Sequence, residues 1–187
     1  MSSRAFNKAR IGGDHHLGEL EMSDAIEAIE AARLSHRPAK VMTLFVGESA
    51  PTGGKFFYNG NNAMLTYTRR AIETALPDTR DFFERFKAYG WYLDDLVLTK
   101  PVDRLKGAAR KAALRNAVSS LSDRIGAYQP QAIVSLMTSI TPFIAEAATA
   151  AGSDATVYSL PFPGNGHQTR FCDKLARIAP LLPRHSS

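Results

Sequence analysis

Residues 41–51, VMTLFVGESAP, carry the strongest indication of the architecture. The segment 41–46 is a continuous apolar run, and Gly47 and Pro51 interrupt it directly afterwards. A short apolar run that is bounded by turn residues is typical of a strand buried on both faces, as in a parallel sheet covered by helices. The segment therefore predicts a central strand whose carboxyl end opens into a turn-rich loop.

Further short apolar segments alternate with stretches of helical spacing along the chain. This alternation predicts a three-layer α/β/α fold with a mainly parallel, four-stranded central sheet. Residues 1–20 show no sustained apolar period, so we expect a flexible arm there, followed by a single domain over 21–187. The strands are expected at 41–46, 91–98, 131–136 and 155–160, and the helices at 23–34, 64–76, 79–89, 108–128, 142–151 and 169–179.

The composition is that of an ordinary globular protein, with 187 residues of which 44% are hydrophobic and 22% charged. No apolar stretch approaches the roughly 18 residues that a membrane-spanning helix needs, and the first residues lack the apolar core of a signal peptide. We therefore expect a cytoplasmic protein with no membrane partner. Cys172 is the only cysteine, which excludes an internal disulfide and a multi-cysteine metal site within one chain. We expect neither a metal ion nor an organic cofactor.

The net charge of +5 favours an anionic partner. Residues 100–124 concentrate this charge, since seven basic residues stand there against two acidic ones. Such a run either faces the phosphates of a nucleic acid or forms a solvated helix face, and both readings stay open. In the first reading, the phosphate-binding candidates are Arg104, Lys106, Arg110 and Lys111.

Ligands of open α/β sheets bind where loops leave the carboxyl ends of the strands. The first such loop, 47–62, reads GESAPTGGKFFYNGNN. Glu48 and Ser49 offer a carboxylate and a hydroxyl that can position a water molecule, and Phe56 and Phe57 offer flat apolar faces. The loop is predicted to bind a ligand; the alternative is a surface loop whose aromatic side chains pack onto the core.

The second loop follows the strand expected at 91–98, which contains two adjacent carboxylates. Side chains alternate across a strand, so Asp94 and Asp95 are expected to face opposite ways. A shared metal ion is therefore less favoured than one functional carboxylate beside one solvated or capping carboxylate.

The third loop is LPFPGNGH, residues 160–167. Pro161 and Pro163 stiffen it, so that little backbone freedom is lost on binding. Asn165 can both donate and accept hydrogen bonds, and His167 can transfer protons near neutral pH. A lone histidine on a loop can equally be incidental.

These loops together resemble those of the uracil-DNA glycosylase superfamily, in the family's order and over most of the chain. FVGESAP (45–51) resembles the motif G-E-A-P-G, with one extra residue before the proline. GGKFFYNGNNAML (53–65) is similar to G-x-P-F-x-G-x-A-G-x-L-L, and WYLDDLVLTKP (91–101) is similar to V-Y-I-T-N-V-V-K-C-R-P. LPFPGN (160–165) resembles the H-P-S-P-R-N motif of the single-strand-selective branch.

The resemblance implies a protein that binds a flipped nucleobase in nucleic acid, in DNA more than in RNA, and hydrolyses an N-glycosidic bond. It assigns the stacking of the base to Phe56 or Phe57 and the reading of its edge to Asp95. Glu48, with Ser49 beside it, would position the attacking water. Asn165 would hold the last loop, and the remaining loop frame would consist of Gly47, Pro51, Pro161 and Pro163.

The departures from the family fall on the chemistry. Leu160 stands where the family has the histidine that stabilises the leaving base, and His167 is the candidate replacement. Asp95 stands where the family reads uracil with Asn. An ionised Asp only accepts hydrogen bonds, so it would repel uracil O4 and suit the N1–H and N2–H₂ groups of guanine or the N4–H₂ group of cytosine.

We therefore expect a base other than uracil. A second hypothesis is a catalytically inactive nucleic-acid or nucleotide binding module with the same fold. A third is a hydrolase site of Glu48, Asp95 and His167 on an unrelated α/β fold. The iron–sulfur cluster of the G-E-A-P-G branch is excluded, because it needs four cysteines.

Overall fold

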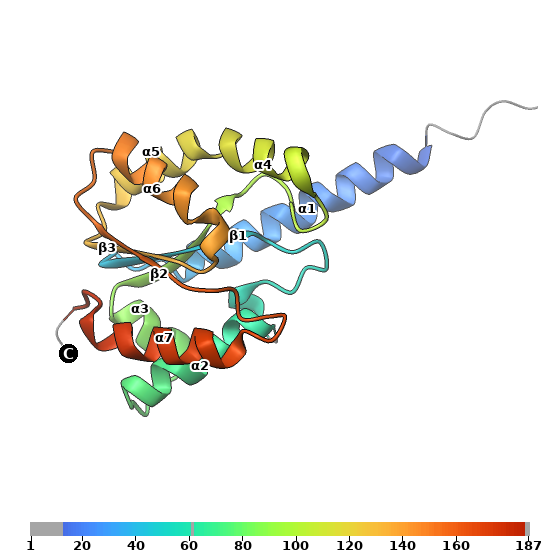
Figure 1. Cartoon of the computed structure of the whole chain (residues 1–187). Coiled ribbons are helices and arrows are strands. Elements are labelled where there is room, and N and C mark those ends of the chain that lie inside the picture. Colours follow the sequence, from blue (N-terminus) through green and yellow to red (C-terminus); the bar gives the residue numbers. More distant parts are fainter. Residues whose placement is uncertain (1–12, 61, 186–187) are drawn as a thin grey trace, which may run out of the picture.

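A computed structural model describes residues 13–60 and 62–185, with side chains from residue 24 onward. Its four strands are all parallel and lie in the order β2-β1-β3-β4. With helices on both faces of this sheet (Figure 1), the predicted three-layer α/β/α fold is confirmed. The strands are β1 (Thr43–Ser49), β2 (Trp91–Val97), β3 (Ala132–Ser135) and β4 (Thr156–Ser159).

Two groups of helices enclose the sheet, one on each face (Figure 1). Helices α2 and α7 pack together on one side with α3, and helices α5 and α6 pack together on the other side with α4. The carboxyl-terminal part of α1 contacts the short helix η1 and, through Arg33, the edge strand β2. The helices are α1 (Gly13–Ser35), η1 (Phe57–Asn59), α2 (Ala63–Ala75), α3 (Phe82–Ala88), α4 (Gly107–Asn116), α5 (Val118–Tyr128), η2 (Thr138–Ile140), α6 (Thr141–Ala150), α7 (Gln168–Ile178) and η3 (Ala179–Leu181).

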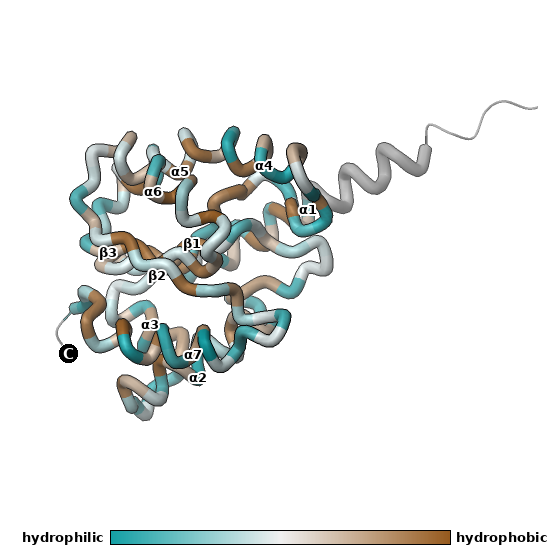
Figure 2. Tube along the Cα trace, in the orientation of Figure 1, coloured by the Kyte–Doolittle hydropathy of each residue, from teal (hydrophilic) through white to brown (hydrophobic). Residues whose placement is uncertain are grey.

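The apolar run that predicted a central strand lies at the centre of the sheet. In β1, Leu44, Phe45 and Val46 have no exposed surface, and Ile133 and Val134 of the neighbouring β3 have none either. Figure 2 shows the most hydrophobic segments in the strands and on the inward sides of the helices. Because both faces of β1 are covered, its residues are apolar without interruption, as a parallel sheet requires.

Two expected helices differ substantially from the structure, one in where it begins and one in its continuity. Helix α1 begins at Gly13, so 13–20 is helical where a flexible arm was expected, while residues 1–12 lie outside the described part of the chain. Leu17, Glu19 and neighbouring residues have good helix propensity, which needs no apolar stripe. The helix expected at 108–128 is interrupted at Ala117, whose N–H bonds to the carbonyl of Leu114 three residues back.

Side chains bond four backbone groups of the edge strand β2. Leu93 N–H donates to the Tyr58 hydroxyl at 2.7 Å, and Asp95 N–H donates to Asp94 Oδ1 at 2.8 Å. Arg124 of α5 donates to the carbonyl oxygens of Asp95 and Leu96, at 3.0 and 3.2 Å. These four backbone groups of the edge strand are therefore satisfied without a further strand, as buried backbone groups require.

The strand order reverses beside β1. From β1 the chain continues to β2 on one side, and it then crosses to β3 on the other side. Such a switch point leaves a crevice between the carboxyl ends of β1 and β3, because the connections from these two strands leave in opposite directions. Open α/β sheets bind ligands in this crevice. Within the described residues, no helix is both long and apolar enough to pass through a lipid bilayer.

Candidate functional site

A cavity of about 350 Å³ opens at this switch point. Its wall includes residues from the end of β1, from β2 and from the segment after β3, together with Phe162 from the loop after β4. The structure thus brings the predicted loops after β1 and β4 to one place, together with Asp95 from within β2. Seven of the predicted residues line the cavity, namely Gly47, Glu48, Ser49, Pro51, Phe56, Phe57 and Asp95.

The predicted residues of the last loop lie elsewhere. His167 and Asn165 are exposed and do not line the cavity, so His167 does not take the place of the family's histidine in this arrangement. The physical reason is a turn: Asn165 and Gly166 have φ of 53° and 85°, and His167 N–H bonds back to the carbonyl of Gly164 at 3.0 Å. The chain thereby leaves the cavity before α7 begins.

The first part of this loop, residues 160–163, presents a different side chain to the cavity. Pro163 is buried, Pro161 is partly buried, and Leu160 is fully buried in the core. Phe162, between the two prolines, is the residue that reaches the cavity. The sequence contained a signal for it, because a large apolar residue was flanked by two prolines at the exit of a strand.

Asp95 lies in the cavity wall and is held by Arg33. The Arg33 guanidinium, whose side chain is 2% exposed, donates to Asp95 Oδ2 at 3.2 Å and lies 3.3 Å from Asp94 Oδ1. Arg124 pairs with the other oxygen of Asp94. Asp94 was expected to be solvated or capping; it is buried and caps Asp95 N–H, because two guanidiniums at the edge of β2 compensate its charge. Burial raises the pKa of Asp95 to about 6, against the opposing effect of Arg33.

Gly47 allows the Asp95 carboxylate to lie across β1. The two residues are partners in the register of β1 and β2. A β-carbon on Gly47 would overlap Asp95 Oδ1 and would lie 3.5 Å from its Cγ. Gly47 is therefore needed because it has no side chain, which leaves room for the Asp95 carboxylate.

Glu48 is paired with Arg110 of α4. The same guanidinium donates to the Ser139 hydroxyl at 3.1 Å, so it links the ends of β1 and β3. Burial raises the pKa of Glu48, and Arg110 opposes this rise. Arg110 is thus paired with Glu48 and Ser139, and its role as a phosphate ligand stays a prediction.

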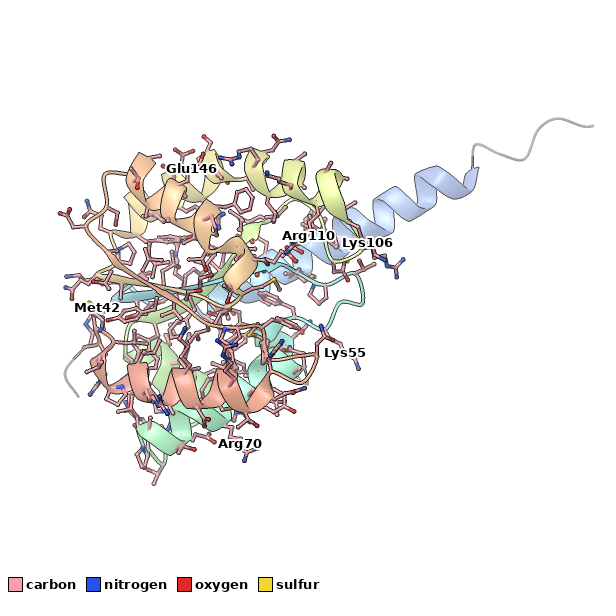
Figure 3. The ribbon with its side chains drawn as sticks, viewed as in Figure 1. Met42, Lys55, Arg70, Lys106, Arg110 and Glu146 are labelled. Carbon is pink, nitrogen blue, oxygen red and sulfur yellow. The ribbon has the colours of Figure 1, made fainter. Side chains whose placement is uncertain are left out.

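The other predicted phosphate-binding residues are exposed. Arg104, Lys106 and Lys111 lie in and before the first turns of α4, and the exposed Lys55 forms part of the cavity wall. Figure 3 shows Lys55, Lys106 and Arg110 at the end of the molecule where α4 begins. The exposure of Arg104, Lys106 and Lys111 fits either alternative stated for this run, a phosphate-binding surface or a solvated helix face.

Ser49 has a structural partner. Its hydroxyl accepts the N–H of Val102 at 3.1 Å. Thr52 donates to Asp103 with its hydroxyl at 2.6 Å and with its N–H at 3.3 Å. Both contacts fasten the loop after β1 to the loop after β2, so Ser49 helps to hold the cavity wall in place.

Phe56 and Phe57 pack onto the core and also line the cavity, so ligand binding by their loop stays a prediction. Their exposed fractions are only 2% and 4%. The Arg33 guanidinium lies 5.2 Å from the centre of the Phe56 ring and covers one of its faces. Phe57 packs against rings of η1 and α3 at centroid distances from 5.0 to 6.4 Å. Both rings are therefore parts of the cavity wall whose positions are fixed by packing.

The sequence did not identify Arg33 as part of the site. Two adjacent carboxylates in a buried strand require cationic partners, and the sequence shows that such partners are needed. Which of the 23 basic residues supplies the charge depends on how α1 packs against β2, and no local pattern reports this contact.

Comparison of the chain with known protein families finds no matching family model, and no curated protein matches it. The resemblance to glycosylases therefore rests on the four motifs, and the function has to be argued from the cavity.

Proposed function

We propose that this chain is a uracil-DNA-glycosylase-like protein that binds a nucleobase of a nucleic acid in the cavity at the ends of β1 and β3. One observation carries the proposal: the loops after β1, β3 and β4 converge there with strand β2, and the cavity that they line contains a buried carboxylate, Asp95, and two aromatic side chains fixed in the core, Phe56 and Phe57. A flat ring matches the aromatic walls, and an edge with N–H donors matches the carboxylate.

The favoured ligand is a base with adjacent donors, such as guanine. Arg33 takes Asp95 Oδ2, which leaves Oδ1 as the oxygen that lies over Gly47. An oxygen of an ionised carboxylate accepts hydrogen bonds only, so guanine N1–H and N2–H₂ suit it and uracil O4 does not. The exposed cations around Lys55 and the start of α4 would contact the phosphates on either side of the base.

Hydrolysis of the N-glycosidic bond is the reaction that we assign to this site. Water would form the new bond to the sugar C1′ and lose a proton to Glu48, while the electron pair of the broken bond leaves with the base. The pKa of Glu48, raised by burial, makes this carboxylate a better proton acceptor than an exposed one.

The second candidate is a binding module without catalysis. It is favoured by the position of His167 outside the cavity and by the burial of Leu160 in the core. With neither residue available, the cavity residues that the structure describes include no histidine to stabilise a leaving base.

Base release from oligonucleotides separates the two candidates. We expect release of guanine or cytosine in preference to uracil, and we expect Glu48→Gln to slow it by roughly a hundredfold or more while binding is kept. His167→Ala is the matched control and should release the base as the wild type does, because this imidazole lies outside the cavity.

Equal release by Glu48→Gln and wild type would remove Glu48 from the mechanism. Binding that weakens steeply with salt, without release of any base, would establish the module instead. Efficient excision of uracil would contradict the role of Asp95, and an absence of binding to every oligonucleotide would contradict both candidates.

The affinity for a donor-bearing base is expected to depend on pH. Asp95 is ionised above about pH 6 and then accepts hydrogen bonds from the base; as the pH falls through about 6 it gains a proton, and the affinity should fall. Titration with deoxyguanosine monophosphate (dGMP) on both sides of this pH measures the effect. Asp95→Asn should bind dGMP weakly and should remove the step at this pH. An unchanged step in Asp95→Asn would show that another group titrates.

A further inference from the structure

Phe162 differs from the other aromatic residues of the cavity. It is 39% exposed, whereas Phe56 and Phe57 are almost completely buried. Among the described residues, the other large hydrophobic side chains with comparable exposure are Leu34 and Leu181, and neither lines the cavity. An exposed aromatic ring at the wall of a cavity has one surface in contact with protein and another available to a ligand.

The backbone on both sides of Phe162 is fixed. Leu160 is anchored in the core, where its N–H donates to the carbonyl of Ser135 at 2.9 Å and its own carbonyl accepts the Thr138 hydroxyl at 3.2 Å. Pro161 and the buried Pro163 restrict the φ angles on either side. The position of Phe162 is therefore set by the fold before any ligand binds.

Gly164 makes room for the ring. A β-carbon at this position would lie 2.6 and 2.9 Å from Cε1 and Cδ1 of Phe162. Gly164 is not among the residues with positive φ, so its backbone conformation is open to other residues. Glycine is needed here for space: the Phe162 ring lies directly against its α-carbon.

We propose that Phe162 is the residue that stacks on the exposed face of the bound base and thereby selects planar heteroaromatic rings. This inference rests on the proposed function, because it assigns a further role in the same cavity. Phe162 comes from the loop after β4, whereas Phe56 and Phe57 come from the loop after β1. A flat ring in the cavity is thus contacted by aromatic groups from separate loops, and stacking tolerates any base while Asp95 discriminates between base edges.

A tryptophan at position 162 reports the contact directly. The chain has a single tryptophan, Trp91, which is fully buried, so the indole introduced by Phe162→Trp has its own solvent-exposed emission. We expect dGMP, and a single-stranded DNA with one guanine among thymines, to quench this emission. Leu181→Trp is the matched control, since Leu181 is 70% exposed and lies outside the cavity. Equal quenching in both variants, or none in Phe162→Trp when dGMP binds, would overturn the proposal.

Affinities complete the test. Phe162→Ala is expected to weaken dGMP binding by about ten- to a hundredfold, the usual loss for one base-stacking ring, and Phe162→Tyr should retain the wild-type affinity. Gly164→Ala should weaken binding as well, because the added methyl group displaces the ring. Thermal unfolding of each variant checks that the fold is kept.

The two hypotheses fail in different ways. If wild-type protein binds dGMP and Phe162→Ala binds it equally well, the stacking role is wrong and the proposed function stands. If the wild type binds neither dGMP nor the oligonucleotide, the proposed function is wrong and the stacking role with it.

Discussion

Arg33→Met is expected to lower the free energy of unfolding by roughly 3–5 kcal/mol. The substitution leaves Asp94 and Asp95 buried with less compensating charge, since Arg33 contacts both carboxylates and is itself 2% exposed. Breaking a buried ion pair from one side costs more than the pair contributes, because the remaining charge keeps its desolvation penalty. Urea denaturation of the variant and of the wild type measures the loss.

Arg115→Met is a closely matched control. Its guanidinium lies 5.2 Å from the centre of the Phe143 ring, as that of Arg33 lies 5.2 Å from the Phe56 ring, and it also pairs with a carboxylate, Glu146. The Arg115 pair is about half exposed, so its loss should cost less than about 1 kcal/mol. Adding Asp95→Asn to Arg33→Met should recover part of the stability. Similar losses of stability in Arg33→Met and Arg115→Met would contradict the view that burial makes the Arg33 pair the more important one.

Gly47→Ala is expected to damage both the fold and the site. The added β-carbon would overlap Asp95 Oδ1, and the carboxylate cannot withdraw freely because Arg33 holds its other oxygen. Overpacking of this kind costs about 1–3 kcal/mol of stability. Displacement of the carboxylate should weaken dGMP binding by about ten- to a hundredfold, since a well-placed base contact contributes about 1–3 kcal/mol.

Gly53→Ala tests the specificity of this effect. Gly53 belongs to the same loop, and no atom lies within 4 Å of the position that its β-carbon would take. The stability and the dGMP affinity of the Gly53→Ala variant should both equal those of the wild type. A Gly47→Ala variant that binds dGMP as the wild type does would show that Asp95 does not contact the base.

The fold was predictable because its main signals are local. The run 41–46 is apolar without interruption since β1 is buried on both faces, and each later strand begins after a turn. The break between α4 and α5 was missed because Ala117 is a good helix former and nothing nearby in the sequence marks a change of direction. The helical residues before Ser23 were missed because helices were predicted from an amphipathic spacing of apolar residues. The first part of α1 has no such spacing.

The candidate site was predictable only where loops follow strands. Glu48 and Asp95 reach the cavity because the carboxyl ends of neighbouring parallel strands lie side by side. His167 was predicted to reach the cavity, but a turn with positive φ at Asn165 directs the chain away from it. The number of residues between Leu160 and His167 is the same with or without such a turn, so sequence spacing does not reveal it. The pairing of Arg33 with Asp95 spans 62 positions of the chain, so it depends on packing that a linear pattern does not describe.

The side chains along the outer edge of β2 also affect how the molecule meets its own copies. A strand from another molecule that approached this edge would find the N–H groups of Leu93 and Asp95 already bonded to Tyr58 and Asp94. Exposed strand edges are templates for aggregation, and at these two positions of β2 the N–H groups that a new strand would need are already bonded. The carboxylate that caps the edge is itself held by Arg33 and Arg124. One cluster of buried charges thus contributes to the cavity wall at Asp95 and also occupies part of this edge of the sheet.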